Sequence, residues 1–210
     1  MRSDYVSCMK ICIGDIRLLI ESVLFETIDI ESHLLSRGID PARTRVISDK
    51  SAGIATFLLF NTSGKLVGYQ QYNPSAPKSG KIAKDLMKYY TYVSKLDNVR
   101  EIAVWGLETV NVNDEFMFIV EGIFDAVKIH NAGYPALAVL SNDPKHIRSW
   151  LRAMNKFVVV IEDNDASAGR KLASIGNASV KTPDPYKDLG EMPQDEVNEF
   201  LRMILSTYLR

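Results

Sequence analysis

Short apolar runs alternate with helical periodicity in the second half of the chain. Apolar residues fill positions 116–120, 136–140 and 157–161, and a short strand is expected around 178–180. Helices are expected over about 123–132, from Asp143-Pro144 onward with apolar residues at 147, 150, 151 and 154, over about 168–175 and over about 194–209. Strands that are apolar along their whole length and separated by helices are typical of a parallel sheet covered on both faces.

The first half has a different pattern. Helices are expected at 15–25 and 31–37, and Gly38 ends the second. The runs 54–60 and 66–72 predict two strands joined by the tight turn Asn61-Thr62-Ser63-Gly64. Residues 73–81 are rich in Pro, Ser and Lys and predict a mobile basic loop. We therefore expect an α/β protein in which a smaller α+β subdomain, residues 1–110, precedes the parallel sheet of residues 111–210.

Composition narrows the class of protein. The chain has 210 residues, of which 46% are hydrophobic and 24% charged, and this excludes disorder for most of its length. Its apolar runs are far shorter than the ~20 residues that span a bilayer, so no membrane partner is expected. Cys8 and Cys12 are too few for a disulfide scaffold or a four-ligand zinc ribbon, which favours a reducing, cytoplasmic location, in the host cytoplasm if the protein is viral. We interpret them as two ordinary thiols on one helical face; metal binding with partner residues is the alternative.

The net charge of −1 conceals a basic segment. Residues 41–100 hold 10 basic and 3 acidic side chains, a net charge of +7, whereas residues 1–40 and 101–210 carry −3 and −5. Aromatic residues are interleaved with lysines there: Phe57, Phe60, Tyr69, Tyr72, Tyr89, Tyr90 and Tyr92 with Lys65, Lys78, Lys81, Lys84, Lys88 and Lys95. Cations for phosphates beside rings for bases fit a single-stranded nucleic acid. A solvated lysine face over an ordinary aromatic core is the alternative.

Carboxylates follow two of the apolar runs. Glu121 directly follows 116–120 with Asp125 four residues later, and the residues Glu162-Asp163-Asn164-Asp165 directly follow 157–161. If the two strands are parallel neighbours, Glu121, Asp163 and Asp165 converge on one rim of the sheet. Crowded carboxylates repel one another unless a cation lies among them, and the Asp-x-Asp pattern suits Mg²⁺ or Mn²⁺. A single acidic residue at a helix N-terminus is often only a cap. The metal-site prediction therefore depends on the order in which the strands, helices and acidic motifs follow one another along the chain.

These motifs resemble a known family. Residues 120–126, VEGIFDA, with 130–134, HNAGY, resemble the first signature of the TOPRIM domain, and residues 158–172, VVVIEDNDASAGRKL, resemble the second. Residues 187–191, KDLGE, look like the K-D-x-x-E element of DNA primases. Upstream, residues 36–39, 64–70, 88–90 and 105–108 are similar in order to the amino-terminal half of the bacterial and phage primase catalytic core. The resemblance covers roughly residues 30–192 and includes neither a zinc ribbon nor a helicase segment.

The resemblance implies a TOPRIM-type parallel sheet flanked by helices and preceded by a smaller basic α+β subdomain. Residues 1–110 would be the basic amino-terminal primase-core subdomain, and 111–210 the TOPRIM domain with a carboxy-terminal helix. The residues at 68–71, GYQQ, depart from the Gly-Gly-Arg of primases, and Asn164 stands where primases often have Gly.

The resemblance also implies roles for individual residues. Glu121 would be a general acid/base or metal ligand, and Asp163 and Asp165 the metal-binding pair. Asp188 would add a further metal contact, with Asp125 supporting the first motif. Lys88 would meet nucleotide or template phosphates, and further candidates for that contact are Lys78, Lys81, Lys84 and Lys187.

We therefore predict a DNA primase-type nucleotidyltransferase that uses Mg²⁺ or Mn²⁺ to make short primers from nucleoside triphosphates on single-stranded DNA for replication. Its expected partners are a replicative helicase or a separate zinc-bearing subunit. The alternatives are a TOPRIM nuclease that activates water with the same carboxylates, and a non-catalytic nucleic-acid-binding replication accessory. The basic segment favours the primase over the nuclease, and the intact carboxylates argue against a purely binding role.

Overall fold

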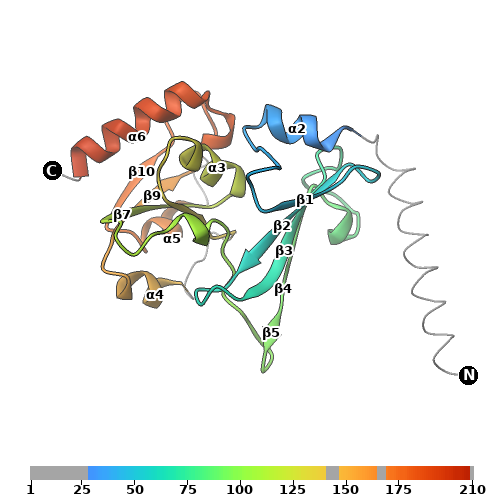
Figure 1. The fold of residues 1–210 in the computed structure, drawn as a ribbon, viewed down its shortest axis with the longest axis horizontal. Helices are drawn as coiled ribbons and strands as arrows, with labels where there is room; N and C mark the ends of the chain where they lie inside the picture. Colours follow the sequence, from blue (N-terminus) through green and yellow to red (C-terminus); the bar gives the residue numbers. More distant parts are fainter. Residues whose placement is uncertain (1–27, 141–146, 165–168, 209–210) are drawn as a thin grey trace, which may run out of the picture. The chain divides into compact units, whose positions relative to one another are not determined.

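The structure is a computed structural model that describes residues 28–140, 147–164 and 169–208 (Figure 1). The helix expected at 15–25, the pair Cys8 and Cys12, the helix start at Asp143-Pro144 and Asp165 lie outside the described residues. The chain forms two compact units that interleave in sequence. One contains residues up to Ser36, 40–57 and 69–92, and the other contains 37–39, 58–68 and 93–210. The domain boundary expected between residues 110 and 111 stays a prediction.

A four-stranded sheet is built from the first part of the chain. Its strands are β1 (Val46–Asp49), β2 (Ile54–Phe60), β3 (Leu66–Tyr72) and β4 (Tyr89–Val93), in that order, and β1 pairs with β2 in antiparallel fashion. The expected hairpin between β2 and β3 is confirmed. The Asn61 N–H donates to the Lys65 carbonyl at 2.9 Å, and Gly64 has a φ of +76°, which favours glycine.

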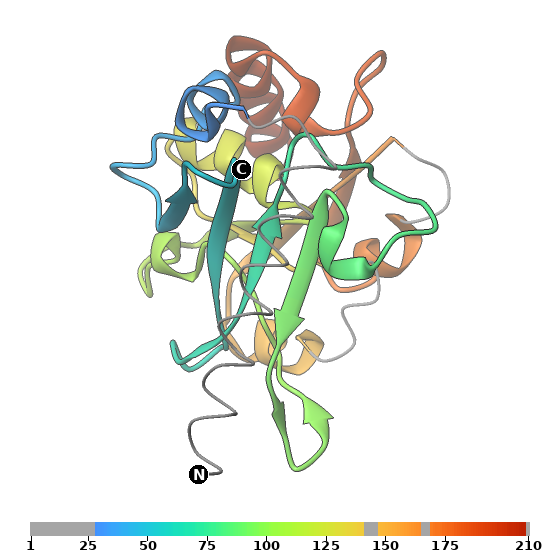
Figure 2. The same ribbon diagram turned by 90° about the vertical axis from the view of Figure 1, so that its right-hand side faces the viewer.

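The helix expected before this sheet is also confirmed. Helix α2 (Ile30–Ser36) begins after Asp29, whose Oδ1 accepts from the Glu31 N–H at 3.2 Å, and Gly38 follows its end with a φ of +79°. After β4 the chain forms a two-stranded antiparallel ladder, β5 (Lys95–Leu96) and β6 (Val99–Arg100), which the sequence pattern did not predict (Figure 2). Residues 73–83 contain no helix or strand, and the short 3-10 helix η1 (Lys84–Leu86) follows them.

The second sheet is parallel throughout. Its strands are β7 (Phe116–Val120), β8 (Ala136–Ala138), β9 (Phe157–Glu162) and β10 (Ala178–Lys181), in the order β10-β9-β7-β8. β7 pairs in parallel with both β8 and β9, and β9 pairs in parallel with β10. This confirms the parallel sheet that the apolar runs predict, and β9 extends one residue further than expected, through Glu162.

Helices cover both faces of the parallel sheet. α3 (Ile123–Asn131) and α6 (Gln194–Tyr208) lie on one side of it, and α4 (Arg148–Ala153) on the other (Figure 1). Leu172 of α5 (Gly169–Ala173) joins α4 in a core cluster with alternate residues of three strands. The buried members of this cluster are Val104, Met117, Ile119, Leu137, Val139, Ile147, Leu151, Val158, Val160, Leu172 and Ile175. Burial on both faces explains why these strands are apolar along their whole length.

The segment before β7 lies against the β8 edge of this sheet. Trp105 forms an antiparallel bridge with Ala138, and the neighbouring Val104 bridges Phe60. Gly106 has a φ of +92°, and a Cβ there would lie 2.5 Å from the Ala136 carbonyl oxygen, so only glycine fits. The 3-10 helix η2 (Leu107–Thr109) follows. The His130 ring stacks on Trp105 with 5.2 Å between ring centroids, and burial lowers the His130 pKa.

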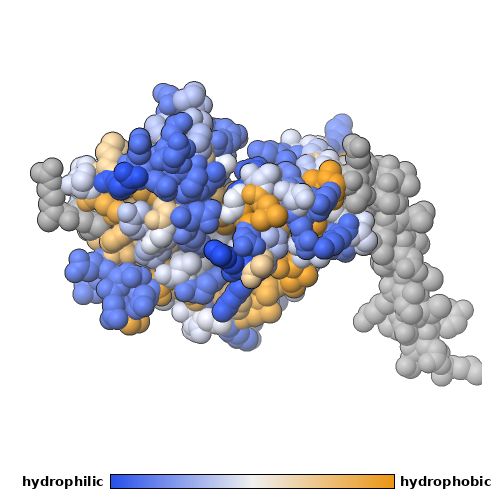
Figure 3. All heavy atoms as spheres, turned by 45° about the horizontal axis from the view of Figure 1, so that its top comes forward, coloured by the Kyte–Doolittle hydropathy of each residue, from blue (hydrophilic) through white to orange (hydrophobic). Residues whose placement is uncertain are grey.

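One face of the protein is largely polar (Figure 3). On the face drawn in Figure 3, hydrophilic residues cover most of the surface and hydrophobic residues form separate patches. Among the described helices, none is long and apolar enough to cross a membrane.

Candidate active site

Two predicted site residues lie at the same rim of the parallel sheet. Glu121 directly follows β7, and Asp163 directly follows β9. The two strands are parallel neighbours whose register aligns Ile119 with Val160, so both carboxyl ends face the same edge. Glu121 and Asp163 therefore leave the sheet at the same edge, while their role as a shared site stays a prediction. Asp165, the third expected member, lies outside the described residues.

Asp125 connects this rim to the 187–191 segment. It lies in the first turn of α3 and is only 7% exposed, and its Oδ1 accepts from the Gly190 N–H at 2.8 Å. Burial raises the pKa of Asp125 to about 8, and the negative charges of Asp188 and then Asp163 add to the rise. Three carboxyl groups from separate segments therefore lie within electrostatic reach of one another.

Residues 187–191 form a capped turn. Asp188 precedes the 3-10 helix η3 (Leu189–Glu191), and its Oδ1 accepts from the Glu191 N–H at 3.0 Å. In return the Glu191 Oε2 accepts from the Lys187 N–H at 3.3 Å. Gly190 allows close packing here, because a Cβ on it would lie 3.1 Å from the Asp188 Oδ1 and 3.3 Å from the Phe124 Cβ, and these neighbours would have to shift. The KDLGE motif thus places Asp188 beside Asp125.

Asn164 joins the end of β9 to the same segment. Its N–H donates to the Lys187 carbonyl at 2.7 Å, and its Nδ2 donates to the Asp184 Oδ1 at 2.5 Å. A glycine would supply only the first of these bonds. The backbone of Asn164 therefore joins the residue after Asp163 to the turn that carries Asp188, and its side chain adds a bond to Asp184.

Glu162 has a different place from the other carboxylates. It is the last residue of β9, is 9% exposed and accepts from the Ser179 hydroxyl of β10. Its carbonyl accepts from both the N–H and the hydroxyl of Thr182, at 2.9 and 3.0 Å. Glu162 therefore joins β9 to the end of β10. The sequence alone could not distinguish the role of Glu162 from that of the neighbouring Asp163, because both are acidic residues at the end of one strand.

A divalent cation is implied by the resemblance to primases, and the donor chemistry fits one. All the gathered side chains offer hard oxygen atoms, and the repulsion that raises the Asp125 pKa is what a cation relieves. Within residues 28–140, 147–164 and 169–208, however, no three acidic, His or Cys side chains lie close enough to hold one ion together. An ion here would add Asp165, water or substrate oxygens to its ligands.

The predicted basic residues lie in two places. Lys187 is exposed in the turn just described. Lys88 is half-buried, with its Nζ 5.7 Å from the Tyr72 ring centroid. Its N–H donates to the Pro77 carbonyl and its carbonyl accepts from the Asn73 N–H, both at 2.9 Å, which anchors the start of the predicted basic loop. The lysines expected to act with it, Lys78, Lys81 and Lys84, are exposed in and after that loop.

The aromatic residues of the basic segment divide into two sets. Phe57 and Tyr72 are fully buried, as the ordinary-core interpretation expects. Tyr92 is 48% exposed and stacks on Tyr69 with 5.4 Å between ring centroids, and Tyr90 meets Tyr69 edge-on at 6.2 Å. The exposed ring of Tyr92, packed on the half-buried Tyr69, supports the nucleic-acid interpretation for part of the segment.

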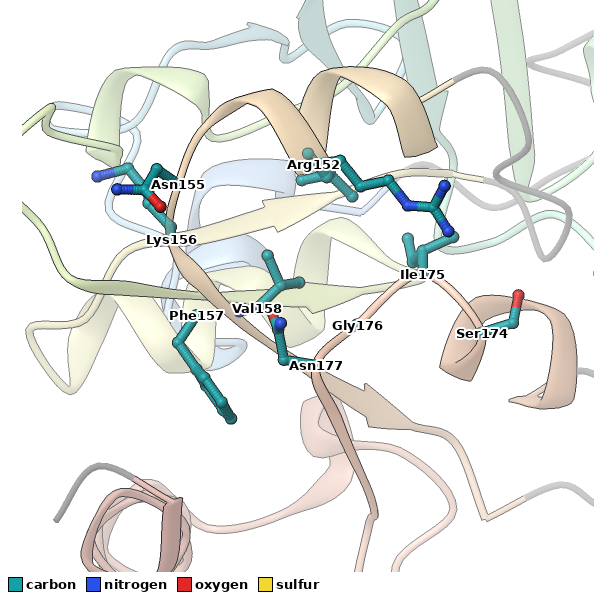
Figure 4. Close-up of a pocket in the computed structure, with 10 residues that line it drawn as sticks. Arg152, Asn155, Lys156, Phe157, Val158, Ser174, Ile175, Gly176 and Asn177 are labelled. Carbon is teal, nitrogen blue, oxygen red and sulfur yellow. Dashed lines mark hydrogen bonds between the residues drawn. The ribbon is translucent and has the colours of Figure 1, made fainter.

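A pocket of about 440 Å³ lies at the opposite end of the parallel sheet, where β9 and β10 begin (Figure 4). It is lined by Arg152, Asn155, Lys156 and Asn177 among others, and no acidic residue lines it. The Lys156 ammonium already donates to the carbonyls of Asn111 and Asp114, at 2.5 Å each. None of the predicted site residues lines this pocket.

Comparisons with solved structures identify the fold. The chain is similar to the Aquifex aeolicus primase, zinc-binding and RNA polymerase domains (TM-score 0.59, 17% identity, covering 84% of this chain and 55% of that one). It is also similar to the DnaG primase catalytic domain bound to single-stranded DNA (TM-score 0.54, 17% identity, 84% and 60%). A third similar structure is the primase fragment of the bacteriophage T7 primase-helicase protein (TM-score 0.50, 14% identity, 71% and 62%).

No protein-family model and no curated protein matches the sequence significantly. The chain spans 55–62% of the length of the three primase chains. It has the mixed α/β fold of the TOPRIM primase catalytic core, so the predicted fold class and resemblance are confirmed at the level of the fold.

Proposed function

We propose that this chain is the catalytic core of a DNA primase, a nucleotidyltransferase that joins nucleotides into primers on a single-stranded DNA template. The observation that carries the proposal is the gathering of Asp125, Asp163 and Asp188 at the rim where Glu121 also ends its strand. Burial raises the pKa of Asp125, and the charges of Asp188 and Asp163 add to the rise; the repulsion among these carboxylates supports a bound cation and a phosphate substrate at this rim.

The ligands proposed for Mg²⁺ or Mn²⁺ are Glu121, Asp163, Asp165 and Asp188. Such an ion would supply charge stabilisation to the reacting phosphate and would favour ionisation of the attacking hydroxyl. Asp125 acts as a positioning residue, because its bond to the Gly190 N–H holds the turn that carries Asp188. Asn164 holds Asp163 against the same turn through the Lys187 carbonyl. The arrangement suits phosphoryl transfer, where positioning and charge stabilisation do most of the catalytic work.

The template would bind the basic segment. Lys78, Lys81, Lys84 and Lys88 would neutralise backbone phosphates, and the exposed ring of Tyr92 would stack on bases. One of the structurally similar proteins is bound to single-stranded DNA and another is part of a primase-helicase. We propose the same kind of partners here, namely a helicase or a zinc-bearing subunit.

The test is incubation with single-stranded DNA, labelled nucleoside triphosphates and Mg²⁺ or Mn²⁺, with and without candidate helicase or zinc-bearing partners. Label that enters oligomers supports the primase. Cutting of a labelled strand instead identifies the nuclease alternative, which uses the same carboxylates. If strand binding is present but neither reaction occurs under any condition, the accessory role replaces both enzymes.

A further inference from the structure

Arg37 lies beside the 187–191 turn and forms no ion pair with an acidic residue in the part of the chain that the structure describes. Its Cζ is 4.6 Å from the centroid of the Phe124 ring, and its Nη2 is 3.5 Å from the Gly190 carbonyl oxygen. A Cβ on Gly190 would lie 3.2 Å from the Arg37 Nη2 and 3.1 Å from the Asp188 Oδ1. The guanidinium and the Asp188 carboxylate therefore flank the same glycine.

Lys128 brings a second positive charge to this place. It follows Phe124 by one helical turn on α3, and its carbonyl accepts from the Gln194 Nε2 at 2.8 Å. Helical side chains lean toward the N-terminus of their helix, so Lys128 extends back toward Phe124 and the carboxylate rim. Burial lowers the pKa of Lys128, and the positive charge of Arg37 lowers it further. The two cations are thus close enough to repel each other.

Neither member of this pair forms an ion pair with a described carboxylate. Ion pairs join Arg43 to Asp40 and Lys50 to Glu31, and Arg37 and Lys128 take part in neither, although the Asp188 carboxylate lies on the other side of Gly190 from Arg37. Both side chains are half-buried, so water screens their repulsion less than it would on an open surface. An arrangement of this kind is costly for the folded protein unless an anion occupies it.

The position next to the carboxylates indicates which anion. A cation held by the acidic rim binds phosphate oxygens on one side, and the free donors of an arginine and a lysine suit phosphate oxygens on the other. A polyphosphate reaching from the rim to the far side of Gly190 would meet both kinds of group. A single carboxylate ligand has no further oxygens with which to reach both the cation and the two basic side chains.

We propose that Lys128, together with Arg37, binds a phosphate group of the substrate, and that this is a terminal phosphate of the incoming nucleoside triphosphate. The inference rests on the proposed function. A backbone phosphate of the nucleic-acid strand is the other source of the same chemistry, and the experiment separates the two. Arg37 also packs on Phe124, so Lys128 is the residue that tests the proposal without disturbing that contact.

The test compares Lys128→Gln with Lys128→Arg, which restores the charge. Arg152→Gln is the matched control, because it removes one positive charge from an exposed position at the opposite end of the sheet. Two affinities are measured on the full chain: that for tripolyphosphate with Mg²⁺ by calorimetry, and that for a labelled single-stranded oligonucleotide at several salt concentrations. Circular dichroism and thermal unfolding establish that each variant folds.

We expect Lys128→Gln to weaken tripolyphosphate binding about tenfold, with Lys128→Arg close to wild type and Arg152→Gln unchanged. Unchanged tripolyphosphate binding with a strand-binding salt slope lowered by ~0.7 would assign the phosphate to the strand instead. If Lys128→Gln leaves the tripolyphosphate affinity, the strand affinity and the salt slope all unchanged, the phosphate site is overturned. Nucleotide incorporation by the wild type is assayed in parallel. If the wild type incorporates nucleotides, the proposed function holds even where the phosphate site is overturned; if it does not, the proposed function fails as well.

Discussion

The two sheets of this protein use their side chains in opposite ways. In the parallel sheet the strands β7 and β9 are buried along nearly their whole length, and the polar residues lie just beyond the strand ends. In the sheet β1-β2-β3-β4, polar and aromatic side chains lie within the strands: Gln70 of β3 donates to the Thr91 hydroxyl of β4 at 2.8 Å, and Tyr92 is half-exposed.

Burial explains the difference. A sheet covered by helices on both faces has no wet surface within its strands, so its chemistry is confined to the rim where the chain leaves the sheet. A sheet with partly exposed side chains can bind along its own surface. We therefore expect substitutions at the rim to affect catalysis and cation binding, and substitutions in the basic segment to affect binding of the strand.

The largest effect expected is at Glu121. Glu121→Gln should reduce nucleotide incorporation by roughly 10²–10⁴-fold, the usual loss for a positioned acid or base, and by more if a metal ligand is lost as well. Binding of single strands should persist nearly unchanged, because the basic segment carries it. Glu199→Gln, an exposed position on α6, is the matched control. Full activity of Glu121→Gln would contradict the TOPRIM-style mechanism whatever the fold.

The second prediction concerns pH and Asp125. Its folded pKa of about 8 lies above its ordinary value of 3.8, so the folded state binds more protons than the unfolded state between these values. The resulting stability is fully present below pH 3.8 and is lost as pH rises toward 8, at up to ~1.4 kcal/mol per pH unit.

Denaturant unfolding with a metal chelator present, at pH values from 5 to 8, measures this dependence. Asp125→Asn, which cannot ionise, should show a flatter curve, whereas Asp195→Asn at an exposed position of α6 should keep the wild-type curve. Equal slopes for Asp125→Asn and wild type would mean that Asp125 is ionised throughout this pH range.

The third prediction separates cation binding from folding. Asp163→Asn or Asp165→Asn should remove Mn²⁺ binding measured by titration calorimetry, while the free energy of unfolding stays equal or rises slightly because like charges are relieved without a change of volume. Asp184→Asn is a useful comparison, because Asp184 accepts from the Asn164 side chain rather than belonging to the proposed ligand set. Undiminished Mn²⁺ binding in both variants of the Asp-x-Asp pair would refute the metal assignment.

The smallest effect is expected from substitutions in and just after the predicted basic loop, residues 73–81, which follows β3. Replacing Lys78, Lys81 and Lys84 together by Ala should weaken strand binding and reduce the salt slope by roughly two units, at ~0.7 per phosphate contact. Tyr92→Ala should weaken binding without changing the slope, since stacking releases no counterions. A slope that the triple variant leaves unchanged would mean that these lysines form only a solvated face.

The sequence alone determined the elements whose signal is local. The hairpin 54–72, the strands β7 and β9, the helix α3 and the position of Glu121 and Asp163 at strand ends all follow from apolar runs, turn residues and the parallel pattern. Each of these depends on neighbours only a few residues away, so the pattern along the chain is sufficient to find them.

Only the tertiary structure decided which distant residues meet. The Gly190 N–H bonds to Asp125, and the Arg37 guanidinium packs on Phe124 near Lys128. Glu162 accepts from Ser179, while the charge of its neighbour Asp163 acts on Asp125. Likewise, the basic segment's pattern could not separate the buried Tyr72 from the exposed Tyr92. Such contacts depend on how separate elements pack, and residue periodicity along one element carries no information about the surface that another element presents to it.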